Sequence, residues 1–235
     1  MAQTNGGKEK QTLVVFASGG KKGKGGGSGF KNLVVQSHKR NLSYEVACVV
    51  SNHADGGVWE KAQELNIPFC YFPGPYTAEE YQKVLKPWGE DVWVALSGWL
   101  KPVHGHDPRR TFNIHPGPLP DFGGDGMFGH HVHEAVIRAH HEKGLKTSAV
   151  SMHFVSNTGK YDDGPVFLHQ PIFICSDDTA DTLAARVNKL EHLWQPTATN
   201  AVVTGKISWD GINPSSLKTP KVFLRHQKAT LTQSI

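Results

Sequence analysis

The first half of the chain alternates short apolar runs with longer amphipathic stretches. Residues 13–17 form an apolar run typical of a buried strand, and residues 30–37 have the spacing of a helix that begins after a glycine-rich turn. The alternation continues, which predicts strands at 44–51, 69–72, 91–96 and 111–114 and helices at 58–65 and 78–85. Strands that alternate with helices at this spacing need crossover connections. The pattern therefore predicts an α/β fold, doubly wound, with a mainly parallel sheet flanked by helices.

Beyond His115 this alternation loosens. A proline- and glycine-rich loop at 116–129 is followed by a predicted helix at 131–142, strands at 147–155 and 166–173, and a helix at 182–193. Asp177 and Asp178 stand where the N-cap of the last helix belongs. Because no linker or repeat interrupts the pattern, we expect a disordered tail at 1–11, a single domain at 12–211 and an irregular C-terminal tail at 212–235.

Composition and length fit an intracellular globular protein. The chain has 235 residues, of which 38% are hydrophobic and 20% charged. A chain of this length and composition can bury a hydrophobic core without disulfides or a structural metal. Its three cysteines, Cys48, Cys70 and Cys175, are an odd number within apolar runs, which argues against a disulfide framework and against a catalytic thiol. No stretch approaches the roughly 18 to 20 apolar residues of a membrane span, and the polar first ten residues lack the apolar core of a signal peptide. We therefore expect a cytoplasmic protein.

Positive charge is concentrated near the start of the chain. The net charge is +4, yet residues 1–40 hold eight Lys and Arg against Glu9 alone. The centre of this excess is the glycine-rich loop at 18–29, which carries Lys21, Lys22 and Lys24. A nucleic-acid groove would spread its bases more widely and interleave them with aromatic residues. The pattern thus favours a local anion, such as a phosphate, over nucleic acid.

The glycine-rich loop follows a strand and opens a helix, which is where backbone N–H groups receive an anion. It matches neither G-x-x-x-x-G-K-[ST] nor G-x-G-x-x-G, and the second strand ends in Ser51 and Asn52 without the acid expected at a ribose. ATP and NAD are therefore disfavoured. The two remaining interpretations are a flexible loop and a phosphate site, the latter formed by the backbone of Gly27, Ser28, Gly29 and Phe30 with lysine assistance.

Asn113 and His115 are the strongest candidates for chemistry. They lie two residues apart at the carboxyl end of a predicted strand, so they share one side of it, at the edge where open α/β sheets bind ligands. An amide can donate to a developing oxyanion, and an imidazole exchanges protons near neutral pH. A lone His is more often a packing residue. However, the turn at 161–165 supplies Asp162 and Asp163, and a buried carboxylate from it would orient His115 and favour its protonated form.

Several motifs in order resemble those of the glycinamide ribonucleotide formyltransferases, the folate-dependent enzymes of purine synthesis. They span residues 13 to about 211 and comprise Asn113-Ile114-His115-Pro116, Leu119-Pro120, Gly123-Gly124, His153-Phe154-Val155, Asp162-Asp163-Gly164-Pro165 and the stretch from Arg186 to His192. The resemblance implies a Rossmann-type, formyltransferase-like fold. It also implies a catalytic trio of Asn113, His115 and Asp162, with Asp163 less suited because the family has glycine there.

The same resemblance implies two substrate sites. The phosphate loop falls on Gly27, Ser28 and Gly29, and the ribose-binding acid falls on Glu191. The folate pocket would be lined by Trp99, Leu100, Lys101, Val103, Val155 and Tyr161. The implied reaction moves the formyl group of 10-formyltetrahydrofolate to the amine of 5-phosphoribosylglycinamide. The implied partners are these small molecules alone, without nucleic acid or membrane, and the implied state is a monomer or a homodimer.

The chain departs from the family pattern at four places. The phosphate loop carries an insertion rich in Gly and Lys, and Ala78 replaces an arginine that the family often brings to the phosphate, so Lys21, Lys22, Lys24 or Lys31 is expected to take over. Lys101 stands where arginine is usual beside the folate, and Thr158-Gly159-Lys160 lengthens the aspartate loop. These departures affect the identity of the substrate more than the type of reaction.

Other functions remain open at this stage. The acceptor amine could belong to a nucleotide sugar or to methionyl-tRNA, although the second usually requires a further C-terminal RNA-binding domain, for which we expect too few residues after Gly211. A related hydrolase generally has an additional N-terminal domain. The chain could also be a non-enzymatic phosphate-binding module.

Fourteen histidines suggest a metal site, but only His130 and His133 share a helical face and no Cys or acid completes the ligands, so we expect no metal.

Overall fold

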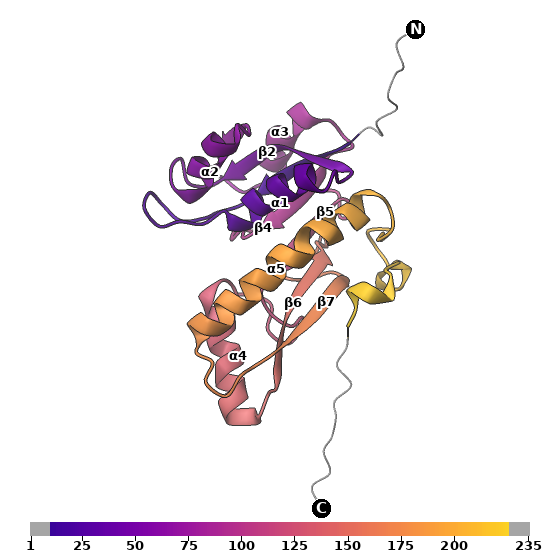
Figure 1. The fold of residues 1–235 in the computed structure, drawn as a ribbon. Helices are drawn as coiled ribbons and strands as arrows, with labels where there is room; N and C mark the ends of the chain where they lie inside the picture. Colours follow the sequence, from indigo (N-terminus) through magenta and orange to yellow (C-terminus); the bar gives the residue numbers. More distant parts are fainter. Residues whose placement is uncertain (1–9, 226–235) are drawn as a thin grey trace, which may run out of the picture.

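The computed structural model describes residues 10–225, so the expected tails lie partly outside the described residues. One seven-stranded sheet has the order β3-β2-β1-β4-β5-β6-β7 (Figure 1). All pairs from β3 to β5 are parallel, whereas β6 runs antiparallel to β5 and to β7. The predicted doubly wound, mainly parallel α/β fold is confirmed. The strands are β1 (Gln11–Phe16), β2 (Tyr44–Ser51), β3 (Phe69–Tyr71), β4 (Trp93–Ser97), β5 (Thr111–His115), β6 (Thr147–Phe154) and β7 (Val166–Phe173).

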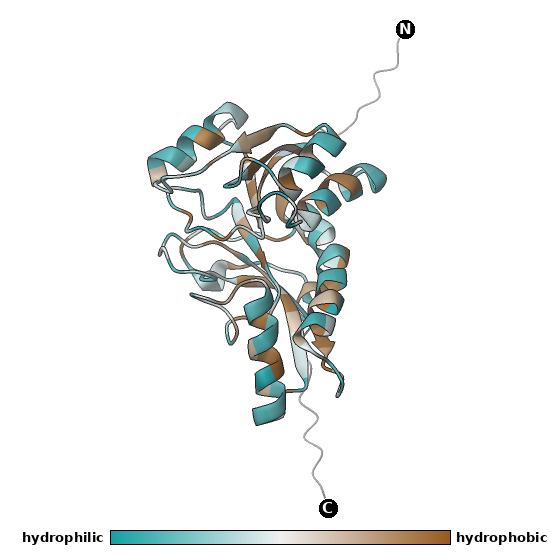
Figure 2. Cartoon of the chain, turned by 90° about the vertical axis from the view of Figure 1, so that its left-hand side faces the viewer, coloured by the Kyte–Doolittle hydropathy of each residue, from teal (hydrophilic) through white to brown (hydrophobic). Residues whose placement is uncertain are grey.

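The sheet is covered on both faces. Along β1, Leu13 and Val15 belong to one buried cluster, while Val14 and Phe16 belong to another on the opposite side of the sheet. This is the alternation of a strand buried on both faces. Figure 2 shows hydrophobic residues along the strands and hydrophilic ones over much of the helices. The helices are α1 (Ser28–Lys39), α2 (Gly57–Leu65), α3 (Ala78–Leu85), α4 (His130–Lys143) and α5 (Ala180–Val203).

The order of the strands indicates where along the sheet a ligand would bind. From β1 the chain winds outward through β2 to β3, then returns to the other side of β1 as β4 and β5. The order therefore reverses between β1 and β4, and ligands of open α/β sheets bind at the carboxyl ends of the strands at such a point. Gly27 follows β1, Ser97 ends β4 and His115 ends β5, so all three lie at this edge.

Helix α5 is longer than the predicted 182–193, and it continues through Pro196 to Val203. Proline has no N–H, so the carbonyl of His192 loses its normal donor within the helix. The side chain of Asn32 in α1 donates to that carbonyl at 2.8 Å, which replaces the missing bond. The α1 helix thus stabilises α5 where the sequence pattern predicts an end.

The predicted N-cap of α5 is also wrong, because Thr179 caps the helix instead of Asp177 or Asp178. The Thr179 hydroxyl accepts from the backbone N–H of Thr182 at 3.2 Å, and Thr182 Oγ1 accepts from the N–H of Thr179 at 2.9 Å. Asp178 instead accepts from the N–H of Cys175 at 2.8 Å and pairs with Arg186.

The segment after α5 is irregular, and part of it packs on the domain. Phe223 is buried in the larger core cluster. The side chain of Gln170 in β7 donates to the carbonyls of Val222 and Phe223, both at 3.0 Å. Within residues 10–225, no helix has the length and apolar character needed to span a bilayer.

Candidate functional site

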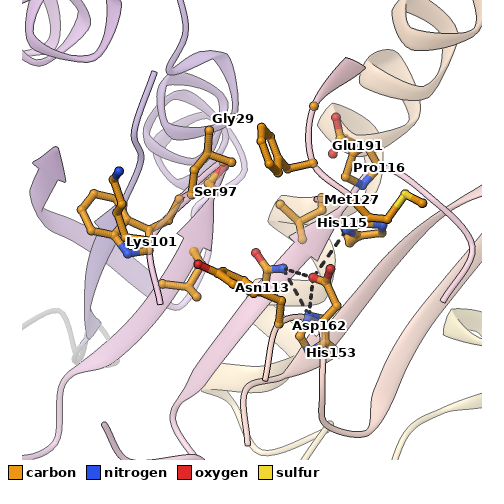
Figure 3. A pocket seen from close by; sticks show the side chains of 18 of the residues that line it. Gly29, Ser97, Lys101, Asn113, His115, Pro116, Met127, His153, Asp162 and Glu191 are labelled. Carbon is orange, nitrogen blue, oxygen red and sulfur yellow. Dashed lines mark hydrogen bonds and ion pairs between the residues drawn. The ribbon is translucent and has the colours of Figure 1, made fainter. Parts of the chain in front are cut away.

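A cavity of about 650 Å³ opens at the carboxyl edge of the sheet, between the N-terminus of α1 and the N-terminus of α4. Its lining residues come from the loop after β1, the ends of β4 and β5, the start of α4, the loop after β6 and one face of α5. Figure 3 shows this cavity with Gly29 and Ser97 on one side and Asn113, His115 and Asp162 on another. Segments far apart in the sequence therefore meet at the point where the strand order reverses.

The structure brings Asn113, His115 and Asp162 together. The amide nitrogen of Asn113 donates to Asp162 Oδ1 at 3.2 Å, and His115 Nδ1 lies 3.5 Å from the same oxygen (Figure 3). The other oxygen, Asp162 Oδ2, accepts from the backbone N–H of Gly124 at 3.0 Å. Asp163, by contrast, accepts hydrogen bonds from Ser156 and Thr158 within its own loop. Of the two adjacent aspartates, Asp162 is the partner of His115.

Both ring nitrogens of His115 have an oxygen close by. The ring is buried, its Nε2 lies 2.7 Å from the carbonyl oxygen of Phe122, and its Nδ1 faces Asp162. Both ring nitrogens thus face acceptors, and only the doubly protonated ring can donate to both. The predicted role of a carboxylate beside His115 has a direct geometric basis.

Asp162 is held as a carboxylate. Burial alone would raise its pKa, but the hydrogen bond from His115 and the charge of that ring outweigh burial and keep the pKa well below its usual range. Its backbone has a φ of 51°, in the left-handed region that a non-glycine residue rarely adopts. Such local strain clusters at functional sites, and here it turns the side chain toward the two histidines.

His153 lies in the site, although in the sequence it stands out only as part of the His153-Phe154-Val155 motif. It pairs with Asn113 across the antiparallel β5–β6 ladder, with its Nε2 3.2 Å from the amide nitrogen of Asn113 and 3.5 Å from Asp162 Oδ1. Its Nδ1 lies 2.8 Å from the carbonyl of Phe154. His153 stands near the end of β6, the strand that leads into the aspartate turn, and as one of several polar residues of that strand it gave no separate signal in the sequence.

The start of α1, where an anion site was predicted, has free backbone N–H groups. Gly27 caps the helix with a φ of 75°, and no side chain occupies the cap. The first helical bond runs from the N–H of Lys31 to the Gly27 carbonyl, at 3.0 Å, which leaves the N–H groups of Ser28, Gly29 and Phe30 without acceptors inside the helix. Gly27, Ser28 and Gly29 line the cavity.

One predicted phosphate residue, Lys31, lies outside the cavity, and Phe30 offers only its backbone, the group on which its prediction depends. The Phe30 side chain is fully buried in the core, so only its backbone is available. Lys31 forms an ion pair with Glu64 of α2 at 2.5 Å and is not a lining residue of the cavity. The side chains of Lys21, Lys22 and Lys24 are exposed on the inserted loop, outside the lining.

Glu191 faces the cavity from α5. The side-chain amide of Asn188, one turn earlier, donates to Glu191 Oε2 at 3.1 Å. Burial raises the pKa of Glu191 to about 7, and the Asn188 hydrogen bond and the charge of His115 offset this only in part. A carboxyl with this pKa is partly protonated near neutral pH, so it can both accept and donate hydrogen bonds.

All six predicted folate residues line the cavity: Trp99, Leu100, Lys101, Val103, Val155 and Tyr161. Trp99 is held by a hydrogen bond from its indole N–H to the Tyr81 hydroxyl at 2.9 Å and packs edge-on against Phe16. Lys101 lies 5.5 Å from the centroid of the Tyr76 ring. Ala78, where the family often has arginine, is absent from the lining.

The histidines of α4 do not form a ligand set. His130 Nε2 lies 3.5 Å from Asp181 and 4.0 Å from Glu134, and all three side chains are exposed at the surface. His133 is buried at the cavity, and burial followed by the charges of His130 and His115 lowers its pKa to about 4. Across residues 10–225, no group of three or more His, Cys, Asp or Glu residues is arranged to hold a metal.

The sequence matches a known family. The family model for formyl transferases matches residues 13–199. The chain belongs to the formyl transferase family. Among curated proteins, this formyl transferase chain is 33% identical to the chloroplastic phosphoribosylglycinamide formyltransferase of Arabidopsis thaliana over 86% of its own length and 70% of that protein. It is 30% identical to the phosphoribosylglycinamide formyltransferase of Bacillus subtilis over 79% of its length and 91% of the relative.

Solved formyl transferase structures share the architecture. The phosphoribosylglycinamide formyltransferase of Coxiella burnetii is 25% identical, with a TM-score of 0.70 over 90% of this chain and all of that one. Glycinamide ribonucleotide transformylase 1 of Symbiobacterium toebii is 25% identical, with a TM-score of 0.71 over 90% of this chain and 95% of that one. A formyltetrahydrofolate deformylase of Pseudomonas syringae has the same fold at 19% identity, with a TM-score of 0.69 over 87% of this chain and 65% of that one.

Proposed function

We propose that the protein transfers the formyl group of 10-formyltetrahydrofolate to the primary amine of 5-phosphoribosylglycinamide, a step of purine biosynthesis. The observation that carries the proposal is the meeting of Asn113, His115 and Asp162 in the same cavity as the open N-terminus of α1 and Glu191. This combination supports chemistry at a formyl carbon and recognition of a ribose phosphate. The relatives of known name support the same acceptor.

The reaction needs no covalent enzyme intermediate. The amine lone pair attacks the formyl carbon, a C–N bond forms, and the carbonyl electrons move to oxygen, which becomes negative. Asn113 and the imidazolium of His115 donate to that oxygen, and a donor of this kind contributes roughly 3 to 4 kcal/mol in comparable sites. The amine then loses a proton, the folate nitrogen gains one, and cleavage of the bond between that nitrogen and the formyl carbon restores the carbonyl.

Each of the two donors, Asn113 and His115, must give up a hydrogen-bond partner within the protein to reach the substrate oxygen. His115 Nε2 lies against the carbonyl of Phe122, and the amide nitrogen of Asn113 faces both Asp162 and His153. Contact with an oxyanion therefore requires His115 to leave Phe122 while its Nδ1 stays beside Asp162. Catalytic hydrogen bonds often tighten only in the substrate complex. Asp162 sustains the imidazolium and, through a water, takes part in moving the proton from amine to leaving nitrogen.

The two substrates bind at different ends of the cavity in this proposal. The N-terminus of α1 holds the phosphate, since its free N–H groups and helix dipole favour an anion. Glu191 holds the ribose, and the side chains from Trp99 to Val103, with Val155 and Tyr161, hold the folate. The cavity volume lies within the usual range of small-molecule sites. The proposed reaction uses no metal.

A transfer assay with a panel of acceptors tests the proposal. Purified protein is given 10-formyltetrahydrofolate with 5-phosphoribosylglycinamide, an amino nucleotide sugar or methionyl-tRNA, and formyl transfer is followed for each. We expect turnover with 5-phosphoribosylglycinamide alone. Saturable folate binding with no transfer to any amine would contradict the proposed acceptor, and absence of a folate site would leave a phosphate-binding module.

We propose the cytoplasm as the site of this reaction, with small-molecule partners only, and a monomer or homodimer as the working state. Light scattering on the purified protein at assay concentration distinguishes the two states.

A further inference from the structure

A buried polar pair lies beside the first turn of α1. Ser97, the last residue of β4, and Gln195 of α5 are only 9% and 1% exposed. The side-chain amide of Gln195 donates to Ser97 Oγ at 3.0 Å. The pair joins α5 to the sheet at the edge that carries the cavity, and Ser97 is one of the lining residues.

Gly29 leaves the space that the Ser97 hydroxyl occupies. A Cβ placed on Gly29 would lie 2.3 Å from Ser97 Oγ, and Figure 3 shows the two residues next to each other at the cavity. In a helix every Cα–Cβ bond tilts toward the N-terminus. Ser97 Oγ, toward which this bond would point, therefore lies close to the first turn of α1, the turn whose N–H groups have no acceptor within the helix.

The Ser97 hydroxyl is set up as a donor. A hydroxyl has one proton and two lone pairs, and Gln195 uses one of the lone pairs. Within residues 10–225, the Ser97 hydroxyl donates no hydrogen bond, although it borders the cavity. An anion at the start of α1 would provide an acceptor for the hydroxyl proton, and a hydrogen bond from a hydroxyl to a charged group is stronger than one to a neutral group.

We infer that Ser97 donates a hydrogen bond to the phosphate of the acceptor substrate, and that Gln195 is a positioning residue that fixes the direction of this donor. The inference rests on the proposed function, because that function places the phosphate at α1. The same helix then serves both ends of the acceptor: Glu191 faces the ribose, and Gln195, one turn later, orients the phosphate donor. The bond from Asn32 to the His192 carbonyl fixes this turn of α5 against α1.

Binding of ribose 5-phosphate, measured by calorimetry, tests the inference without relying on turnover. Ser97→Ala removes the donor, and Ser97→Cys keeps nearly the same volume with a much weaker donor. We expect both to weaken ribose 5-phosphate binding about tenfold or more, as loss of a hydrogen bond to a charged group does. Ribose without phosphate should bind all three proteins equally weakly, and the thermal midpoint of each variant establishes that it is folded.

A double-mutant cycle separates positioning from general structure. Gln195→Met retains the side-chain length, and we expect it to weaken ribose 5-phosphate binding about three- to fivefold in the natural protein but not in the Ser97→Ala background. In the transfer assay, KM for 5-phosphoribosylglycinamide should rise in Ser97→Ala, with kcat and the KM for folate within about twofold of the starting values.

The inference is overturned if Ser97→Ala and Ser97→Cys bind ribose 5-phosphate as tightly as the natural protein, if that protein shows no phosphate-dependent binding, or if Gln195→Met acts equally in both backgrounds. If binding depends on Ser97 as expected but 5-phosphoribosylglycinamide is not formylated, the phosphate site stands and the proposed acceptor fails.

Discussion

The amide nitrogen of Asn113 lies 3.2 Å from Nε2 of His153, directly across the antiparallel ladder of β5 and β6. The same amide donates to Asp162, and His153 also borders that carboxylate. His153 is buried and bonded through Nδ1 to the carbonyl of Phe154, so its ring is fixed. The pair therefore sets the angle at which Asn113 faces the cavity.

We predict that His153→Ala lowers kcat about tenfold or more while KM for both substrates stays within about twofold, since small displacements of a catalytic group are costly. His153→Gln keeps an amide oxygen that can accept from Asn113 and should recover part of the rate. Steady-state kinetics on both variants checks this. An unchanged kcat in His153→Ala would show that Asn113 needs no support from β6.

Replacement of His115 is a stricter test of the proposed catalytic trio of Asn113, His115 and Asp162. His115→Ala removes a donor to the developing oxyanion, so turnover should fall at least about a hundredfold. Binding of a folate analogue, followed by protein fluorescence, should be largely retained because the folate residues lie on other segments. His131→Ala, on the exposed side of α4, is the matched control and should retain full activity. Normal turnover without the His115 imidazole would remove it from the mechanism.

The sequence predicts regular elements better than contacts between them. Strands β2 and β7 and helix α3 have the predicted bounds, because each is a compact pattern closed by polar residues or proline. Helix α5 was predicted too short, since its passage through Pro196 depends on Asn32, which is far away in the sequence. Lys31 was predicted at the phosphate, yet its charge is paired with Glu64 of the neighbouring helix.

In the candidate site too, features within one strand could be predicted from the sequence, whereas contacts between strands could not. Asn113 and His115 could be predicted as a pair because they share one strand, where side chains alternate. The contact of His153 with them depends on the register of an antiparallel pair, which the sequence of one strand does not specify. The Phe122 carbonyl that meets His115 is a backbone group and has no residue-type signal at all.

Glu191 should give stability a specific pH dependence. Burial raises its pKa from 4.5 to about 7 in the folded chain, so between these values the unfolded chain releases a proton that the folded one retains. The stabilisation is therefore complete below about pH 4.5 and is lost as the pH rises through 7, and we expect a loss of about 1 to 3 kcal/mol. Denaturant unfolding at pH 5 and pH 8 measures it.

Glu191→Gln is the control for this titration, because it retains the shape without the ionisation. The difference in the free energy of unfolding between pH 5 and pH 8 should shrink by the amount assigned to Glu191. Asp162 acts in a separate range: its depressed pKa stabilises the fold above about pH 4, and that contribution is lost at lower pH. An identical pH dependence in Glu191→Gln would mean that the carboxyl is ionised when folded.

Asn32 and Pro196 should be coupled in stability. Asn32→Leu leaves the partly buried carbonyl of His192 without a donor, which should lower the free energy of unfolding by about 1 kcal/mol. Pro196→Ala restores the backbone N–H that normally reaches this carbonyl in a helix. In the Asn32→Leu background it should therefore recover part of the lost stability, whereas in the natural protein the carbonyl already has a donor and the gain should be smaller. Urea unfolding of the four proteins gives the coupling energy, and additive effects would show that Asn32 stabilises the chain by some route other than the His192 carbonyl.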